Sequence, residues 1–446
     1  MLPSNDSTVS RRAFLKTSAA TIGASGAILS LPQRVYAGGS DTLRVGVVGC
    51  GGRGTGAARD IAAGAEGIEI VAMGDLVPDR LAKSRAQLAE NIPEQYRVDD
   101  ARAFTGFDAY QRVLETDIDL VILATPPGFR PVHLQAAVAA GKHIFTEKPV
   151  AVDPVGVRAV LAAADSAAGK GIAVVAGTQR RHDPRYIEIM RRVHDGAIGD
   201  VVAGQVYWNQ GGLWHFERTA GMSDMEWQIR NWLYFTWLSG DHVVEQHIHN
   251  IDVANWALGG PPVRANGVGG RQSRLDPSFG HVFDHFCVEL EYANGARILS
   301  MCRQQDGTTR YVGEQFTGTR GAANPSERNP WIRGEQEYRW SEEGEPVNPY
   351  VQEHTDLVAS IRAGSPLNEL RRVAESTLTA ILVREAAYTG TAITWDEIMA
   401  ADLDLTPGPL AFGTLPVPPV AQPGITKLSR PPFGHAREET PSSVGG

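Results

Sequence analysis

The sequence predicts an α/β fold of two domains, and three observations support this. The apolar run 43–48 leads into the glycine-rich segment 49–54, which has the form GxGxxG. Apolar strand-like runs then alternate with helix-like segments up to residue 177, as in a parallel sheet with crossover helices. From about residue 197, strand-like runs alternate apolar and polar residues, as in an antiparallel sheet. We therefore expect an N-terminal Rossmann dinucleotide-binding domain and a C-terminal α/β domain with a large, open, mainly antiparallel sheet.

The first domain is expected to cover residues 43–177. Five apolar runs predict its parallel strands, at 43–48, 68–73, 119–124, 144–146 and 172–176. Helices are predicted between them, at 78–91, around 132–138 and at 155–168. In such a sheet, ligands bind beyond the carboxyl ends of the strands, so we expect the functional site there.

The second domain is expected to cover residues 178–400. Its strands are predicted at 201–208, 286–292 and 296–302, the last two joined by a hairpin turn at Asn294-Gly295, with helical runs at 246–258 and 350–389. With three cysteines the fold is not expected to be built on disulfides, although Cys287 and Cys302 could pair if they lay opposite each other on neighbouring strands. Residues 406–446 are rich in Pro and Gly, and we expect this tail to wrap a surface or to stay disordered.

The first 37 residues have the pattern of an export signal. The segment SRRAFLK at 10–16 carries the twin arginines, a mildly apolar stretch follows, and small residues end the segment at Ala37. That stretch is shorter than the roughly 20 apolar residues of a membrane span, so a membrane anchor is the weaker alternative. We expect a periplasmic or otherwise exported protein without a stable membrane span. The formal net charge of −9 disfavours nucleic acid as a partner.

The glycine-rich segment predicts the cofactor site. Gly49 permits the tight turn, Gly51 lets a pyrophosphate approach bare backbone, and Gly54 lets the next helix pack closely on the strand. Asp75 follows about 20 residues later, where an acid can bind both ribose hydroxyls. This favours NAD, whereas Arg80 keeps NADP open because an arginine can bind a 2′-phosphate. The alternative is a glycine-rich turn in another kind of α/β domain.

Four segments together resemble the Gfo/Idh/MocA dehydrogenases: the glycine loop, residues 124–127 with His133, residues 141–149 and residues 245–252. The resemblance covers about residues 43–400, and the Glu-Lys-Pro element is its most specific part. It implies a nicotinamide-binding Rossmann domain, a second domain whose open sheet forms the substrate wall, and a dimer or tetramer. The predicted cofactor-binding residues are Gly49, Gly51, Gly52, Arg53, Gly54, Asp75, Thr125, Pro126, Pro127, His133, Glu147 and Lys148.

The resemblance also implies catalytic residues in the Glu-Lys-Pro element. Lys148 matches the lysine that binds or polarises the reacting oxygen in the family. Pro149, which is often cis in the family, would orient the Lys148 side chain. Glu147 would hold the loop and the cofactor. A desolvated lysine beside a positively charged nicotinamide can exchange a proton with a substrate hydroxyl. The alternative is a charged pair at the surface.

A second group of candidate residues lies in the C-terminal domain. Glu245, His249 and Asp252 are spaced i, i+4 and i+7, which places them on one face of a helix. In the family these positions usually read Asp-x-x-x-His-x-x-Asp, so His249 would be the general acid/base, with Glu245 in place of the commoner Asp. We predict Glu245 as a further catalytic residue and Asp252 as a substrate contact. A structural role is the alternative for His249.

Two more substrate contacts are predicted. Arg181 follows the last strand of the first domain, at the crossover between domains. Trp232 belongs to an aromatic tract between residues 208 and 237. The flat rings of this tract suit the apolar faces of sugars. The alternative is that they form a core or a subunit contact. Arg271 is a weaker candidate for the same cleft.

The histidine-rich segment also contains residue types that bind zinc. His242, His247, His249 and Glu245 could supply imidazole and carboxylate ligands. Because His247 and His249 are two positions apart, they point to different faces of one helix. We therefore predict no metal.

These observations predict an NAD(P)-dependent oxidoreductase that takes a hydride from a secondary hydroxyl of a sugar, sugar derivative or cyclitol. Because an exported protein has no evident NADH pool to exchange with, we expect a tightly retained cofactor that is reoxidised on the enzyme. One alternative is an NAD-dependent glycosidase, which oxidises a sugar transiently, eliminates the aglycone and reduces the product again. Another is a non-catalytic sugar or redox sensor.

Overall fold

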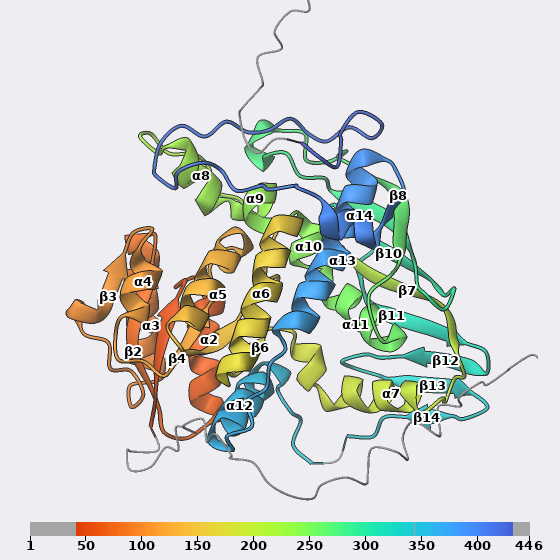
Figure 1. Cartoon of the computed structure of the whole chain (residues 1–446), viewed down its shortest axis with the longest axis horizontal. Coiled ribbons are helices and arrows are strands. Elements are labelled where there is room, and N and C mark those ends of the chain that lie inside the picture. The colour runs from red at the N-terminus through yellow and green to blue at the C-terminus, as the bar shows by residue number, and fades with distance from the viewer. Residues whose placement is uncertain (1–41, 343, 431–446) are drawn as a thin grey trace, which may run out of the picture. The chain divides into compact units, whose positions relative to one another are not determined.

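The computed structural model describes residues 42–342 and 344–430, and its first domain is built on a parallel sheet (Figure 1). The strands lie in the order β3-β2-β1-β4-β5-β6, and every neighbouring pair is parallel. Their bounds are β1 Leu43–Val48, β2 Ile68–Asp75, β3 Ala103–Thr105, β4 Leu120–Leu123, β5 His143–Thr146 and β6 Val174–Ala176. This is the doubly wound strand order of dinucleotide-binding domains, so the predicted fold class is confirmed.

Helices cover both faces of this sheet because its strands are apolar on both sides. Their bounds are α2 Gly52–Gly64, α3 Pro78–Asn91, α4 Ala109–Leu114, α5 Arg130–Ala139 and α6 Pro154–Lys170. The sequence missed β3 and α4, which are only three and six residues long. Such short elements carry too few residues for a periodic signal.

The second domain carries a nine-stranded sheet in the order β14-β13-β12-β11-β7-β10-β9-β8-β15. Only β7 and β10 pair in parallel among these strands, so the sheet is mainly antiparallel as predicted. The bounds are β7 Val201–Gln210, β8 Arg264–Gly270, β9 His285–Glu291, β10 Arg297–Gln304, β11 Tyr311–Gly318, β12 Gly321–Asn324, β13 Trp331–Gly334, β14 Tyr338–Arg339 and β15 Ile393–Thr394. The predicted hairpin turn joins β9 to β10, and Gly295 there has a φ of 84°.

Two predicted helices differ from the structure. The run 350–389 is two helices rather than one, because the chain turns at Gly364, whose φ is 64°. The run 246–258 begins at Ile248, after a separate short helix. The helices are α7 Pro184–His194, α8 Asp224–Arg230, α9 Thr236–Ser239, α10 His242–Glu245, α11 Ile248–Leu258, α12 Pro349–Arg362, α13 Leu370–Thr389 and α14 Trp395–Ala400.

Helix α12 packs against the first domain, although it belongs to the C-terminal part of the chain (Figure 1). Thr355 Oγ1 donates a 2.9 Å hydrogen bond to the Gly64 carbonyl at the end of α2. The His354 ring lies 3.9 Å from the Phe145 ring of β5, measured between centroids. The first domain therefore takes part of its cover from beyond residue 177, which a division at a single chain position cannot describe.

His354 predicts a pH-dependent loss of stability. Its ring is fully buried, neither nitrogen has a hydrogen-bonding partner among the described residues, and burial, with Arg53 and His182 nearby, lowers its pKa to about 3. The unfolded chain binds a proton at this histidine below about pH 6.5, whereas the folded chain does not, so stability falls as the pH drops from there toward 3.

We expect His354→Leu to reduce this loss. Between pH 7.5 and pH 5, the variant should lose about 2 kcal/mol less unfolding free energy than the wild type. Urea unfolding at the two pH values measures the difference. An identical pH dependence in the two proteins would show that His354 takes up its proton in the folded protein at the same pH as in the unfolded chain.

The condition for a disulfide between Cys287 and Cys302 is not met, because of the strand register. β9 and β10 are neighbours, but Cys287 faces Met301 and Cys302 faces Phe286, so the two cysteines lie one position apart and point to opposite faces. The predicted Pro- and Gly-rich tail is described only up to Arg430. The Arg430 guanidinium binds Glu385 of α13 at 2.6 Å, so this part of the tail contacts the second domain. The predicted export signal, 1–37, lies outside the described residues. None of the described helices is both long and apolar enough to cross a membrane.

Candidate active site

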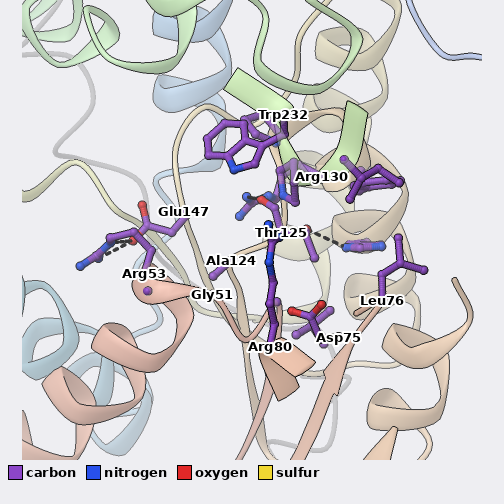
Figure 2. A pocket seen from close by; sticks show the side chains of 18 of the residues that line it. Gly51, Arg53, Asp75, Leu76, Arg80, Ala124, Thr125, Arg130, Glu147 and Trp232 are labelled. Carbon is purple, nitrogen blue, oxygen red and sulfur yellow. Dashed lines mark hydrogen bonds and ion pairs between the residues drawn. The ribbon is translucent and has the colours of Figure 1, made fainter. Parts of the chain in front are cut away.

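A pocket of about 580 Å³ lies at the carboxyl edge of the parallel sheet, between the two domains. Its lining runs from Asp75 and Phe107, beside β2 and β3, past the glycine loop to Lys148 after β5. Residues of the second domain, among them Trp232 and His249, close the other side. Figure 2 shows Arg80 alongside Asp75, and Arg53 in contact with Glu147 at one side of the pocket.

The glycine loop matches the three roles expected of it. Gly49 has a φ of +93°, and a Cβ there would lie 2.6 Å from the carbonyl carbon of Ala124. A Cβ on Gly54 would lie 1.8 Å from the Gly49 carbonyl oxygen, so only glycine allows α2 to start here. Gly51 and Gly52 have open space around their Cα atoms, which leaves bare backbone at the start of α2.

Asp75 ends β2 in the place expected for a ribose-binding acid. Its carboxylate accepts hydrogen bonds from the Cys50 amide at 2.6 Å and the Val77 amide at 2.8 Å. Burial raises the pKa of Asp75 above its ordinary value. Arg80 also lines the pocket beside it, so the residues of both the NAD and the NADP hypothesis lie at this end.

Two polar groups hold the loops around the middle of the pocket. Arg53 Nε donates to Glu147 Oε1 at 2.9 Å, and its guanidinium lies 5.2 Å from the centre of the Tyr350 ring. Thr125 Oγ1 and His133 Nδ1 lie 3.1 Å apart, and burial together with the Arg130 charge lowers the pKa of His133 to about 3. His133 is therefore a neutral ring that positions Thr125.

Lys148 lies at the junction of the two domains. Its Nζ donates to Glu245 Oε1 at 2.9 Å and also to the Glu245 main-chain carbonyl. The side chains of Lys148 and Glu245 are only 11% and 13% exposed, and the peptide bond to Pro149 is cis. The two residues predicted to be catalytic from distant parts of the sequence are thus in direct contact.

His249 lines the same pocket from the first turn of α11. Its ring stacks on the Trp208 ring, with the ring centres 5.8 Å apart. Burial lowers its pKa well below the ordinary value, and the charges of Lys148, Arg180 and Arg53 lower it further. The ring is therefore neutral near pH 7, and one of its nitrogens can accept a hydrogen bond.

Arg181 and Asp252 are not where a substrate contact was predicted. Asp252 faces away from the pocket lining and accepts hydrogen bonds from Arg181 at 2.8 Å and from Ser376 at 2.7 Å. Although burial opposes it, Arg181 and Arg372 lower the pKa of Asp252 to about 2. The i, i+7 spacing predicted that Glu245 and Asp252 share one helix face, but Glu245 ends α10, whereas Asp252 lies on α11 after a turn of the chain. Arg181, in the turn Gln179–His182 after β6, and Asp252 on α11 instead form a buried ion pair, and Arg372 and Ser376 of α13 also bind Asp252.

The aromatic tract divides into two groups. Trp208, Trp214 and Trp232 line the pocket. The others, namely Trp227, Tyr234, Phe235 and Trp237, are buried in a separate apolar core. The core alternative therefore holds for the second group, whereas a sugar contact stays a prediction for the first. Arg271 does not line the pocket, because its guanidinium binds the Gly280 and Asp276 carbonyls.

The remaining histidines of the zinc hypothesis have separate partners. His242 Nδ1 lies 2.9 Å from Asp241 Oδ1, and His247 Nε2 lies 2.9 Å from Ser300 Oγ. Within residues 42–342 and 344–430, no group of three acidic, histidine or cysteine side chains is arranged to hold a metal ion.

The sequence missed several residues of the pocket. They are Phe107, Tyr110, Phe129, Arg130, Gln246 and Tyr350. Most lie in loops or at the ends of short helices, where no local motif marks them. Only the position of Gln246 next to Glu245 could have indicated one of them.

Family models match both domains in chain order. The model "Oxidoreductase family, NAD-binding Rossmann fold" matches residues 43–174, and "GFO/IDH/MocA C-terminal domain" matches residues 186–324. Among curated proteins, the chain is 26% identical over 257 residues to an inositol 2-dehydrogenase of Gluconacetobacter diazotrophicus, covering 58% of this chain and 66% of that protein. It is 36% identical over 157 residues to inositol 2-dehydrogenase 4 of Saccharopolyspora erythraea, covering 35% and 42%. These alignments span less than two thirds of either relative.

Solved structures share the fold over nearly their whole length. An aldose-aldose oxidoreductase of Caulobacter crescentus superposes with a TM-score of 0.61 at 20% identity, covering 79% of this chain and 99% of that one. A scyllo-inositol dehydrogenase of Lactobacillus casei with bound NAD(H) and scyllo-inositol gives 0.60 at 19% identity, with the same coverage. The two domains, their order and the glycine loop agree with these matches, and the chain belongs to the Gfo/Idh/MocA oxidoreductase family with an NAD-binding Rossmann domain.

Proposed function

We propose that this protein is an NAD-dependent oxidoreductase that acts on a secondary hydroxyl of a sugar, sugar derivative or cyclitol. The observation that carries the proposal is the placement of Lys148 and a neutral His249 in one pocket with the glycine loop. The similarity to inositol dehydrogenases supports the substrate class. The pocket-lining tryptophans support it as well, because their flat rings suit the apolar faces of sugar rings.

The residues at the carboxyl edge of the parallel sheet fit a dinucleotide. Gly51 and Gly52 leave room for a pyrophosphate at the start of α2, and the Asp75 carboxylate lies in the pocket where a ribose would bind. NAD, when bound, supplies the acceptor for the hydride of the substrate carbon. Arg80 keeps NADP as the less favoured cofactor.

Lys148 and His249 can divide the remaining work of the reaction. An ammonium group has three N–H donors, and Glu245 accepts two hydrogen bonds from Lys148 Nζ, so one donor can bind the substrate oxygen. The neutral His249 ring can accept the hydroxyl proton as the carbon is oxidised. Glu245 holds the Lys148 ammonium in place from the second domain, so the site is complete only when both domains are in contact.

The export pattern at residues 10–16 supports a retained cofactor. A twin-arginine route carries folded proteins, so NAD can be loaded before export, and a second substrate must then reoxidise NADH on the enzyme. We propose a periplasmic enzyme with a closed redox cycle, assembled as a dimer or tetramer.

A panel of sugars, cyclitols and glycosides added to the purified mature protein, without external NAD, tests this function. We expect bound NAD to be present and to become reduced by a member of the panel, seen as the absorbance of NADH. Free aglycone released without net reduction would favour the glycosidase alternative. Bound NAD that no compound reduces, with or without added NAD, would contradict an oxidoreductase and favour a sensor.

A further inference from the structure

The ribose end of the pocket is bounded by chain segments from far apart in the sequence. Phe107, in the loop after β3, lines the pocket on the same side as Asp75. Because the pyrophosphate binds at the end of β1 and the ribose at the end of β2, the adenine of a bound dinucleotide lies toward β3 and Phe107. A residue that covers Phe107 therefore covers the adenine end of the site.

That cover comes from the C-terminal tail. The Phe412 ring packs on the Phe107 ring with their centres 5.3 Å apart and their planes tilted by 54°. In Figure 1 the tail, drawn in dark blue, runs alongside α8. It has no helix or strand between residues 406 and 430, so its position depends on side-chain and main-chain contacts.

Helix α8 holds this part of the tail in place. The Gly413 carbonyl accepts from the Met225 amide at 3.1 Å, and the Leu415 amide donates to Asp224 Oδ2 at 3.1 Å. Gln228 Nε2 donates to the Leu415 carbonyl at 2.8 Å. The Leu415 side chain is buried in the apolar core that also contains the tryptophans of this region. The tail and α8 thus form one wall.

The same wall is tied to the first domain beside the ribose site. Arg230, at the end of α8, binds both carboxylate oxygens of Asp79 at 3.2 and 3.3 Å. Asp79 precedes Arg80 on α3, and Ile229, next to Arg230, lines the pocket. The wall therefore meets the first domain at two points, Asp79 and Phe107.

We propose that α8 and the tail segment around Phe412 act as a strap that holds the adenosine end of the cofactor and slows its release. Phe107 is the residue that touches the cofactor, whereas Phe412 and Arg230 are positioning residues that act through Phe107 and Asp79. The inference rests on the proposed retention of NAD, and it explains how a pocket open to solvent could keep a dinucleotide after export.

Release of NADH from the purified mature protein tests the strap. The protein is loaded with NADH, diluted into excess NAD, and the loss of bound-NADH fluorescence is followed over time. We expect Phe412→Ala to release NADH about tenfold faster than the wild type, because one face of Phe107 is uncovered. Arg230→Ala should also accelerate release. Ile425→Ala is the matched control, because Ile425 lies in the same tail and is 69% exposed.

A second measurement separates holding the cofactor from stabilising the fold. If Phe412 holds the cofactor, its replacement leaves the melting temperature of the cofactor-free protein unchanged and reduces only the increase caused by NADH. Equal release rates in wild type, Phe412→Ala and Arg230→Ala, or a lower melting temperature without cofactor, would overturn the strap. Sugar oxidation with added NAD would still support the proposed function in that case, whereas a wild type that binds no dinucleotide would overturn both.

Discussion

Replacing Lys148 with alanine is expected to lower kcat for sugar or cyclitol oxidation by about a thousandfold while NAD remains bound. The Lys148 ammonium is the cation of the pocket that binds Glu245 and has a donor left for the substrate oxygen. Alanine removes that donor and leaves the buried Glu245 carboxylate without its partner. Steady-state kinetics with the best substrate of the panel, together with the NAD content of the purified variant, measure the two effects separately.

Two variants make this result specific. Lys83→Ala removes a lysine from the exposed face of α3 and should leave kcat unchanged. Glu245→Gln keeps the main-chain carbonyl that also binds Lys148, so its loss in kcat should be smaller than that of Lys148→Ala. Turnover of Lys148→Ala at the wild-type rate would exclude Lys148 from the chemistry. A variant that loses NAD as well would assign Lys148 to cofactor binding instead.

The second large effect is expected from single methyl groups in the glycine loop. In Gly54→Ala the new Cβ would overlap the Gly49 carbonyl oxygen, so the start of α2 must move. We expect this variant to lose about 2 kcal/mol of unfolding free energy and to bind NAD at least a hundredfold more weakly. In Gly51→Ala the new Cβ meets no protein atom within 4 Å, so the fold should be unaffected. NAD binding should still weaken about tenfold or more, because the methyl group occupies the approach of the pyrophosphate.

Urea unfolding without cofactor and NAD titration of each variant measure this contrast. Gly169→Ala is a control, because its Cβ also meets open space and it lies on the exposed end of α6, far along the chain from the loop. It should bind NAD like the wild type and be as stable or slightly more stable. If Gly51→Ala bound NAD as tightly as Gly169→Ala, the pyrophosphate would not lie at the start of α2.

The parallel sheet could be predicted because its strands are buried on both faces and read as continuous apolar runs. The short strands β13 and β14 could not, since four or two residues show no alternation. The break at Gly364 was missed because apolar and polar residues keep a helical spacing on both sides of it. Whether Cys287 and Cys302 lie opposite each other depended on the register of β9 and β10, which differs by one residue from the one that pairing needs and which the sequence left open.

The candidate site shows the same division. The positions of Gly49, Gly54, Asp75 and Lys148 in the pocket could be predicted because each depends on local backbone or on the end of a strand. Asp252 was assigned to the substrate from its spacing and Arg181 from its place after the last strand of the first domain, but the two residues bind each other, since a buried carboxylate needs a cation close by. Spacing along a chain cannot tell a residue that faces a pocket from one that faces a neighbouring helix.

The sequence by itself determined the class of fold, the dinucleotide loop and the family of this protein, because each depends on short segments whose backbone and apolar pattern are local. Only the tertiary structure decided that Glu245 binds Lys148, that α12 covers the first domain, and that Phe412 covers Phe107 at the adenosine end. The physical reason is that these contacts join residues 97 or more positions apart. Such contacts form when apolar faces pack together and buried charges find partners, and no local pattern of residues specifies which distant segment supplies them.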